Sequence, residues 1–357
     1  MKPTQSSPAR ALRNAALLWP FPVLAGLAAA GCSRPAGVLF EPADPRYRWP
    51  AAPDDARVQY IGQLQSDQDL KPARSGGKGL NEFLFGKDAA HTMLSPIGVC
   101  SDGHGRLFVA DSNAQAVHVF DLGTRKYELW RPPEGQPRFS QPVAIAFDGR
   151  VLVADSVAGL IFAFDPRGKL LGTFGLNKLK RPCGIAADPS HNRLFVVDSA
   201  AHQVVILSSS GEEIGRLGQR GSGPGQFNFP TSATLDGQGR LYVSDSLNFR
   251  IQVFSPELAF VRQIGRKGDM PGYFSQPKGI ALDPDGHLYV VDANFEAVQL
   301  FGDQGELLMT FGHEGHGPGE FWLPVGIHID SSGRVFIADA YNRRVQVFQY
   351  LAEGRSP

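Results

Sequence analysis

The chain has 357 residues, in which 35 Lys and Arg balance 35 Asp and Glu, so the formal net charge is zero at neutral pH. No bulk positive field is available to attract nucleic acid or an anionic membrane surface, which disfavours nucleic acid as a partner. The sequence is 42% hydrophobic and contains 41 glycines and 27 prolines, which predicts many turns, few long helices and an all-β fold.

The first thirty residues carry an export signal. An apolar stretch over residues 15–30 follows the basic residues Lys2, Arg10 and Arg13. This arrangement is typical of a signal peptide. The apolar stretch is short and contains two prolines, which disfavours a membrane-spanning helix.

A possible lipid-attachment motif ends this signal. Small residues lead up to Cys32, and the pattern resembles the lipobox of bacterial lipoproteins, although that family most often has Leu where this sequence has Ala29. The resemblance implies that residues 1–31 are removed, that Cys32 becomes the acylated first residue, and that the protein lies at the periplasmic face of the outer membrane. In the alternative, the segment is an ordinary secretory signal, Cys32 is unmodified and the protein is free in the periplasm.

Composition divides the mature chain into three parts. Residues 32–56 are rich in Pro and Ala, show no apolar period and are expected to form a tether. Residues 57–350 are expected to form the folded domain, and residues 351–357 a polar tail. The domain contains two cysteines, Cys100 and Cys183, so no disulfide framework is expected.

Six copies of one pattern fill the domain. In each copy a first strand begins with Pro, a second ends in Asp, a third alternates as in Val-Gln-Leu-Phe, and a fourth ends in an apolar residue and Gly. The aspartates recur at the blade-sized spacing of 43 to 47 residues: Asp111, Asp155, Asp198, Asp245, Asp292 and Asp339. A lone four-stranded sheet with two apolar faces cannot stay in water, so the repeats predict a six-bladed β-propeller of four-stranded antiparallel blades.

The repeats also carry a family pattern. Segments of the form P-x-G-I-A-x-D, L-Y-V-x-D and R-I-Q-V-F, followed by G-x-G-P-G-x-F, resemble NHL repeats over roughly residues 57–350. The chain looks most like uncharacterised exported bacterial NHL-repeat lipoproteins. The resemblance implies the fold but no single function, because NHL propellers include RNA-binding domains, a lyase and sensor domains.

Strand counting predicts how the ring closes. The sixth repeat runs from Pro324 to Phe348, and the chain ends before it can make a fourth strand. Residues 58–62 form an unassigned strand-like run that matches the fourth strand at residues 261–265. We expect residues 58–62 to pair with residues 344–348 and to complete the last blade.

One face of the propeller is the expected binding face. It carries the loops from each fourth strand to the next first strand and the loops from second to third strands, and we call it the loop face. The candidate binding residues are basic and lie near these loops: Arg250, Arg266, Lys267, Lys278, Arg343 and Arg344. Together with Lys178, Lys180 and Arg181 they could form a rim for an anionic partner, or they are scattered solvated charges.

Two repeated features are expected to be structural. Phe227, Phe274 and Phe321, in the longest loops of this face, are expected to fill the gaps between blades. The six aspartates of the second strands are expected to cap the turns that follow them, by accepting hydrogen bonds from backbone N–H groups.

The first strands offer little chemistry for catalysis. The residues two and four places after each repeat proline, expected to line the channel, are mostly small. Cys100 and His328 occupy equivalent positions in neighbouring blades and form a speculative channel pair, as a soft-metal ligand set or a nucleophile and base. Because no nucleophile elbow, P-loop or dinucleotide motif is present, we predict no catalytic residues, no metal and no cofactor.

These features predict a non-enzymatic interaction or scaffold module of the bacterial cell envelope, which binds a protein or glycan through its loop face. Its contact with the membrane is expected through the lipid anchor only. Two alternatives stay open. One is a metal-dependent hydrolase or lyase with a site in the central channel, and the other is a structural subunit of an envelope complex.

Overall fold

The computed structural model describes residues 36–41, 44–73 and 89–351. The expected signal segment, Cys32 and all but the first residue of the expected polar tail lie outside these residues.

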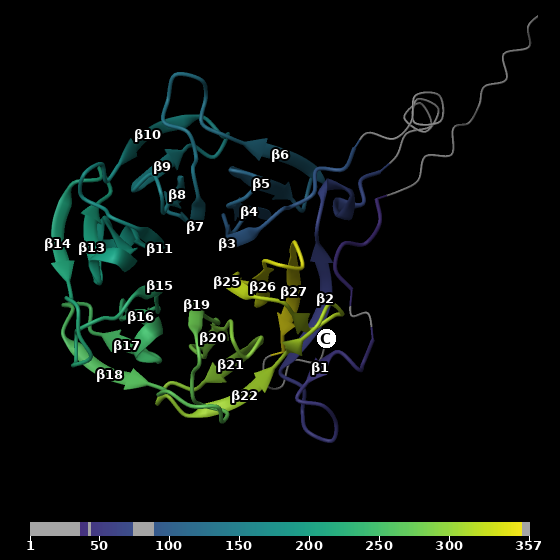
Figure 1. The fold of residues 1–357 in the computed structure, drawn as a ribbon. Coiled ribbons are helices and arrows are strands. Elements are labelled where there is room, and N and C mark those ends of the chain that lie inside the picture. The colour runs from purple at the N-terminus through teal and green to yellow at the C-terminus, as the bar shows by residue number, and fades with distance from the viewer. Residues whose placement is uncertain (1–35, 42–43, 74–88, 352–357) are drawn as a thin grey trace, which may run out of the picture.

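Six four-stranded antiparallel blades form a closed ring, which confirms the predicted six-bladed β-propeller (Figure 1). From the channel outward, the first three blades are β3 (Pro96–Ser101), β4 (Arg106–Asp111), β5 (Ala116–Asp121) and β6 (Lys126–Trp130); β7 (Pro142–Phe147), β8 (Val151–Asp155), β9 (Leu160–Phe164) and β10 (Leu170–Phe174); β11 (Pro182–Asp188), β12 (Arg193–Asp198), β13 (Gln203–Ser208) and β14 (Glu213–Leu217). The next two are β15 (Pro230–Leu235), β16 (Leu241–Asp245), β17 (Arg250–Phe254) and β18 (Phe260–Ile264); β19 (Pro277–Leu282), β20 (Leu288–Asp292), β21 (Ala297–Phe301) and β22 (Leu307–Phe311).

The sixth blade joins the two ends of the domain. It contains β25 (Pro324–Ile329), β26 (Arg334–Asp339) and β27 (Arg344–Tyr350) from the C-terminal end, and β2 (Val58–Leu64) from the N-terminal end. β2 pairs antiparallel with β27, with Val58 opposite Tyr350 and Leu64 opposite Val345. The predicted closure of the ring by the N-terminal strand is therefore confirmed.

Part of the predicted tether belongs to the fold. β1 (Arg48–Trp49) pairs with β2 and adds a fifth strand to the outer edge of the sixth blade. The ring of Trp49 lies 5.8 Å from that of Phe311 and 5.9 Å from that of Phe348. The Pro-rich composition concealed this short pairing, in which Tyr47 and Trp49 both pack against the cluster between the fifth and sixth blades.

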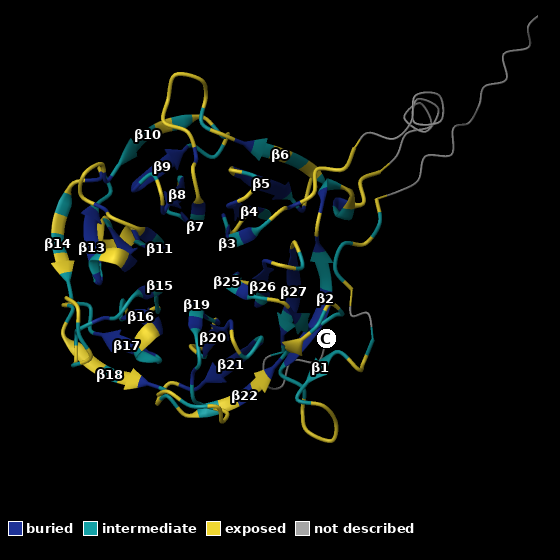
Figure 2. Cartoon of the chain, in the orientation of Figure 1, coloured by how far each residue is buried: buried dark blue, intermediate teal, exposed yellow. Residues whose placement is uncertain are grey.

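Burial follows position within each blade (Figure 2). Second and third strands such as β20 and β21 are buried at every residue, because a neighbouring blade covers each face. Fourth strands such as β22 alternate between exposed and less exposed residues. Each first strand begins with Pro, which is tolerated there because this strand is an edge of its sheet and needs no N–H donor on its free side.

Six apolar clusters lie between neighbouring blades and form the core of the ring. Their members come from the facing strands of the two blades. Phe227, Phe274 and Phe321 are fully buried in three of these clusters, which confirms that they fill the gaps between blades.

The remaining elements are short. They are the single-turn helices η1 (Asp67–Leu70), η2 (Pro189–His191), η3 (Ser199–Ala201) and η4 (Ser246–Asn248), and the parallel pair β23 (His313–Glu314) and β24 (Glu320–Phe321). Within the described part of the chain, no helix has the length and apolar character needed to cross a bilayer.

Candidate functional site

The aspartates that end the second strands hold the loop face in place. Asp292 is fully buried, and its carboxylate accepts hydrogen bonds from the backbone N–H of Asn294 (3.1 Å) in the following turn. It also accepts from Ser275 (2.7 Å) and Gln276 (2.9 Å), just before the first strand of its own blade. Each such carboxylate therefore ties two loops together, and the second of these ties was not predicted.

The predicted cap of the following turn is confirmed in the first, second, third and fifth blades, at Asp111, Asp155, Asp198 and Asp292. In the fourth and sixth blades side chains donate in its place. Asp245 accepts from Asn248 Nδ2 (2.8 Å) and Arg250 Nε (2.9 Å). Asp339 accepts from Asn342 Nδ2 (2.9 Å) and Arg344 Nε (2.8 Å). All six aspartates are fully buried, so their carboxylates serve the fold and are not available to a ligand.

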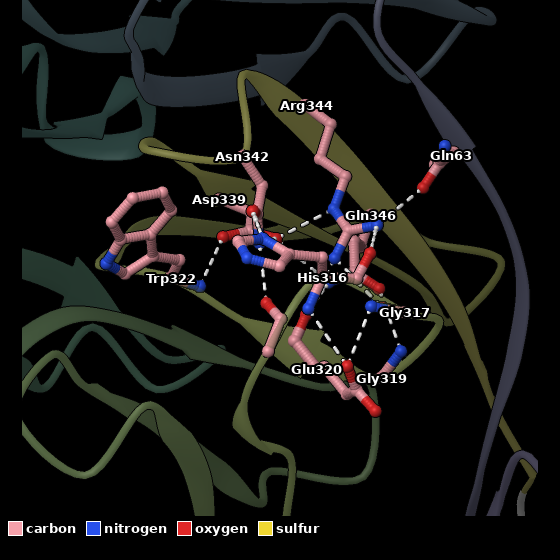
Figure 3. Close-up of polar contacts among 11 residues, drawn as sticks. Gln63, His316, Gly317, Gly319, Glu320, Trp322, Asp339, Asn342, Arg344 and Gln346 are labelled. Atoms are coloured by element: carbon pink, nitrogen blue, oxygen red, sulfur yellow. Dashed lines mark hydrogen bonds and ion pairs between the residues drawn. The ribbon is translucent and has the colours of Figure 1, made fainter.

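Arg344 lies at the centre of the densest of these networks (Figure 3). Besides Asp339, its guanidinium donates to Gln63 Oε1 of β2 (2.9 Å) and to the carbonyl oxygens of His316 (2.8 Å), Gly317 (2.9 Å) and Glu320 (2.8 Å). Arg344 is 3% exposed. Its role is to join the closing strand, the last third strand and the preceding loop.

Arg250 is placed in the same way in the fourth blade. Its guanidinium donates to Asp245, to Gln263 Oε1 (3.0 Å) and to the carbonyl oxygens of Gly223 (2.8 Å) and Gln226 (3.0 Å). The prediction that Arg250 and Arg344 form part of a binding surface is therefore wrong. Each is buried because an aspartate five residues earlier and the carbonyls of a loop surround its charge.

The other four basic candidates keep some exposure. The Arg266 guanidinium lies 4.4 Å from the ring centre of Tyr273, and the Lys267 ammonium lies 5.1 Å from that of Phe249. Arg343 is exposed, and Lys278 is half-buried in the channel wall. A role for these four in binding a partner stays a prediction.

Exposed apolar side chains distinguish the loop face from the opposite face. Of the large hydrophobic residues that are exposed in the described chain, seven lie in loops of the loop face: Leu94, Val157, Leu176, Leu247, Met270, Trp322 and Tyr341. Their exposures range from 43% to 67%. The described loops of the opposite face contain no exposed large hydrophobic residue. Sequence reasoning concentrated on charge and missed this asymmetry.

Two of these residues form an aromatic cluster on the sixth blade. Trp322 and Tyr341 are 43% and 56% exposed, and their rings meet edge to face at 5.3 Å. The ring of His316 lies 5.3 Å from Trp322 on another side, and its Nδ1 is 2.5 Å from Asn342 Oδ1. The backbone N–H of Trp322 donates to Asp339 (2.8 Å), so a buried network fixes the backbone beneath the exposed rings.

The six first strands enclose a central cavity of about 660 Å³. The residues two and four places after the repeat prolines line it, as expected. At the first of these places the backbone also lies close to the neighbouring blade. A Cβ added to Gly279 would lie 2.4 Å from the carbonyl oxygen of Val325, and one added to Gly326 would lie 2.2 Å from that of Ile97. Small residues recur here because adjacent first strands approach closely.

Side chains one and five places after each proline remain partly exposed and line the cavity. At the end nearest the loop face they are Ile97, Val143, Cys183, Thr231, Lys278 and Val325. At the other end they are Ser101, Phe147, Ala187, Leu235, Leu282 and Ile329. The lining therefore changes from partly polar at the first end to mainly apolar at the second.

The structure does not join Cys100 and His328 by a hydrogen bond. Nε2 of His328 lies 2.8 Å from Oγ of Ser101, and burial lowers the pKa of His328 to about 4. Cys100 packs between the first two blades, where burial raises the pKa of its thiol. Adjacent side chains of β3 point in different directions, so Ser101 meets His328 while Cys100 does not. The described residues contain no group of three or more His, Cys, Asp or Glu arranged to hold a metal ion.

Comparison with known proteins agrees with this architecture. A family model described as a 6-bladed beta-propeller matches residues 235–298 and 284–356, about a third of the chain. The chain is a six-bladed β-propeller. No curated protein sequence matches it significantly.

Three similar solved structures illustrate how widely this architecture is used. A Bacteroides thetaiotaomicron protein of unknown function is 17% identical, with a TM-score of 0.58 over 74% of this chain and 71% of that chain. An auxiliary nutrient binding protein from the same organism is 14% identical, with a TM-score of 0.58 over 72% and 69%. Virginiamycin B lyase from Staphylococcus aureus is 16% identical, with a TM-score of 0.54 over 72% and 96%. At such identities the likeness shows the fold alone.

Proposed function

We propose that the protein is a non-enzymatic binding module of the bacterial cell envelope, which recognises a protein or glycan partner through its loop face. The observation that carries the proposal is the distribution of exposed apolar side chains. Leu94, Val157, Leu247, Trp322 and Tyr341 lie in loops of this face, whereas the described loops of the opposite face expose no large hydrophobic residue.

Such a distribution is typical of a recognition surface. Exposed apolar groups on a soluble domain mark interaction sites when they gather on one side, and interface centres are enriched in Trp and Tyr. Trp322 and Tyr341 supply large rings whose backbone is already fixed, so little conformational freedom is lost on binding. The description of two similar Bacteroides structures as auxiliary nutrient binding proteins is compatible with a binding role.

The proposal includes attachment to the membrane through Cys32. A lipid at the first mature residue would hold the propeller at the periplasmic face of the outer membrane, where an envelope protein or a glycan is within reach.

Capture of the protein from its native envelope after cross-linking tests the proposal. The wild type is compared with a double variant, Trp322→Ala with Tyr341→Ala, and with Leu308→Ala, which removes an exposed side chain from the outer strand β22. We expect the same partner with the wild type and Leu308→Ala, and its loss with the double variant, provided that all three proteins show the same melting temperature.

Other outcomes would favour the alternatives. Unchanged capture by the double variant would contradict recognition through this cluster. Loss of the partner with Leu308→Ala only would favour a structural subunit that binds through its sides. One tightly held equivalent of metal in the purified protein would favour a metal-dependent hydrolase or lyase.

A further inference from the structure

The end of the channel nearest the loop face carries two basic residues in its lining. Lys278, at the start of β19, and Arg181, just before β11, both belong to the lining of the 660 Å³ cavity. The described residues that line this cavity include no Asp or Glu. In a chain whose total charge is zero, this end of the channel is therefore locally cationic.

The ammonium of Lys278 lies in the channel wall and has no direct contact with a carboxylate among the described residues. Lys278 is half-buried, and among the described residues its ammonium makes no hydrogen bond and no ion pair. Burial lowers the pKa of Lys278 and the charge of Arg181 also lowers it, whereas the charge of Asp292, whose carboxylate already accepts backbone hydrogen bonds, acts in the opposite direction. Lys278 and Arg181 belong to the same cavity lining. A partly desolvated ammonium is costly unless an anion accompanies it.

Two further groups of the lining are uncharged and can donate hydrogen bonds. Burial raises the pKa of the Cys183 thiol to about 12, so it remains protonated, and its sulfur lies 3.4 Å from the carbonyl oxygen of Pro230. Ser246 belongs to the same lining and is 2% exposed, and its hydroxyl has no partner among the described residues. A hydroxyl without a hydrogen-bond partner therefore lies in the same lining as the two cations.

The rest of the cavity suits an apolar group. Phe147, Leu235, Leu282 and Ile329 lie in its lining at the far end. A volume of 660 Å³ falls within the range of sites for small organic ligands, which combine a mostly apolar wall with a few polar groups that orient the ligand.

We propose that the channel binds an amphipathic carboxylate, with the carboxylate between Lys278 and Arg181 and the apolar part directed toward Leu235 and Leu282. The site is independent of partner recognition by the exposed rings of the loop face. Removal of the aromatic cluster leaves it intact, and failure of either proposal leaves the other standing.

Isothermal titration with decanoate, below its micellar concentration, tests the site on the purified folded domain. We expect saturable binding of one decanoate per protein, and binding of decanol weaker by about tenfold because it lacks the charge. Acetate should not bind measurably, because it lacks the apolar chain. Equal binding of decanol and decanoate, or no saturable binding of decanoate, would overturn the proposal.

Variants locate the site. Lys278→Gln should weaken decanoate binding by about tenfold, whereas Lys126→Gln, at an exposed site of the outer strand β6 and outside the channel lining, should not change it. Ala187→Phe narrows the far end without altering charge and should also weaken binding. Melting temperatures verify folding of each variant. Wild-type affinity in a folded Lys278→Gln variant would show that decanoate binds elsewhere.

Discussion

Tyr60 of β2 lies directly opposite Phe348 of β27, and their rings meet edge to face with centroids 5.6 Å apart. The contact joins the first and last strands of the domain, so the ring is closed by strand pairing and side-chain packing. Both residues belong to the cluster that also buries Phe311 and Phe321. Loss of this contact therefore affects two blades at once.

Deletion of residues 57–64 should abolish the single sharp unfolding transition, because it leaves β27 with an unpaired edge. The point variant Tyr60→Ala should lower the free energy of unfolding by about 3 kcal/mol. Val261→Ala, at an exposed site of the fourth strand β18, should change it by less than about 0.5 kcal/mol. Urea denaturation measures all three. A deletion variant that unfolds as sharply and at the same urea concentration as the intact domain would refute this mode of closure.

Arg344 and Arg343 provide a matched pair of neighbouring cations. Arg344→Lys keeps the charge but cannot reproduce five hydrogen bonds from one planar group, and should destabilise the domain by about 3 kcal/mol. Arg343 is exposed with φ of 55°, a conformation that Asn tolerates, so Arg343→Asn should be nearly neutral. Equal stability of Arg344→Lys and the wild type would show that the network contributes little.

The fold was predictable because it repeats. The spacing of six aspartates fixed the number of blades, and counting strands identified residues 58–62 as the closing segment. The burial of Arg250 and Arg344 was not predicted, since the carbonyls that surround them belong to loops 24 to 28 residues earlier. A usable pattern existed: in both blades the arginine stands five residues after the aspartate and two before a glutamine.

The predicted lining residues do border the channel, but which residues of the lining keep partial exposure was not predicted. Successive side chains along a strand point to its two opposite faces. In this ring both faces of a first strand pack against neighbouring blades near the middle of the strand. In β19 the lining residues that keep partial exposure are Lys278 and Leu282, near the two ends of the strand. The period of the sequence does not show the tilt and spacing of the strands, which decide how exposed each lining residue is.

Attachment to a membrane is predicted to depend on Cys32. Several acyl chains on one residue hold a protein firmly, whereas the described domain contains no helix suited to spanning a bilayer. Cys32→Ala should therefore move the folded domain from the membrane fraction to the soluble fraction, and Cys183→Ala should not. Fractionation followed by immunoblotting measures this. A wild type that is already soluble would contradict the lipobox prediction.

His328 should make the domain sensitive to mild acid. Burial lowers its pKa from 6.5 to about 4, so between these values the unfolded chain binds a proton that the folded chain does not. The folded state therefore keeps its full stability above pH 6.5 and loses it as the pH falls toward 4, by at most about 3 kcal/mol from this group. His328→Gln can still bond to Ser101 and should lose less stability over this window. Chemical denaturation at pH 7 and pH 4.5 compares the two proteins, and identical losses would contradict the prediction.

Where the last blade meets the first, Gly326 should be the glycine that tolerates a side chain least. A Cβ there would lie 2.2 Å from the carbonyl oxygen of Ile97 and 3.3 Å from Cα of Gly98, both on the neighbouring first strand β3. Backbone atoms cannot rotate away, so Gly326→Ala should separate β25 from β3 and destabilise the domain by about 1 to 3 kcal/mol. Gly237 has open space around the same position, so Gly237→Ala should be neutral or stabilising by about 0.5 kcal/mol. Urea midpoints distinguish the two variants, and a Gly326→Ala protein as stable as Gly237→Ala would show that the first strands can separate freely.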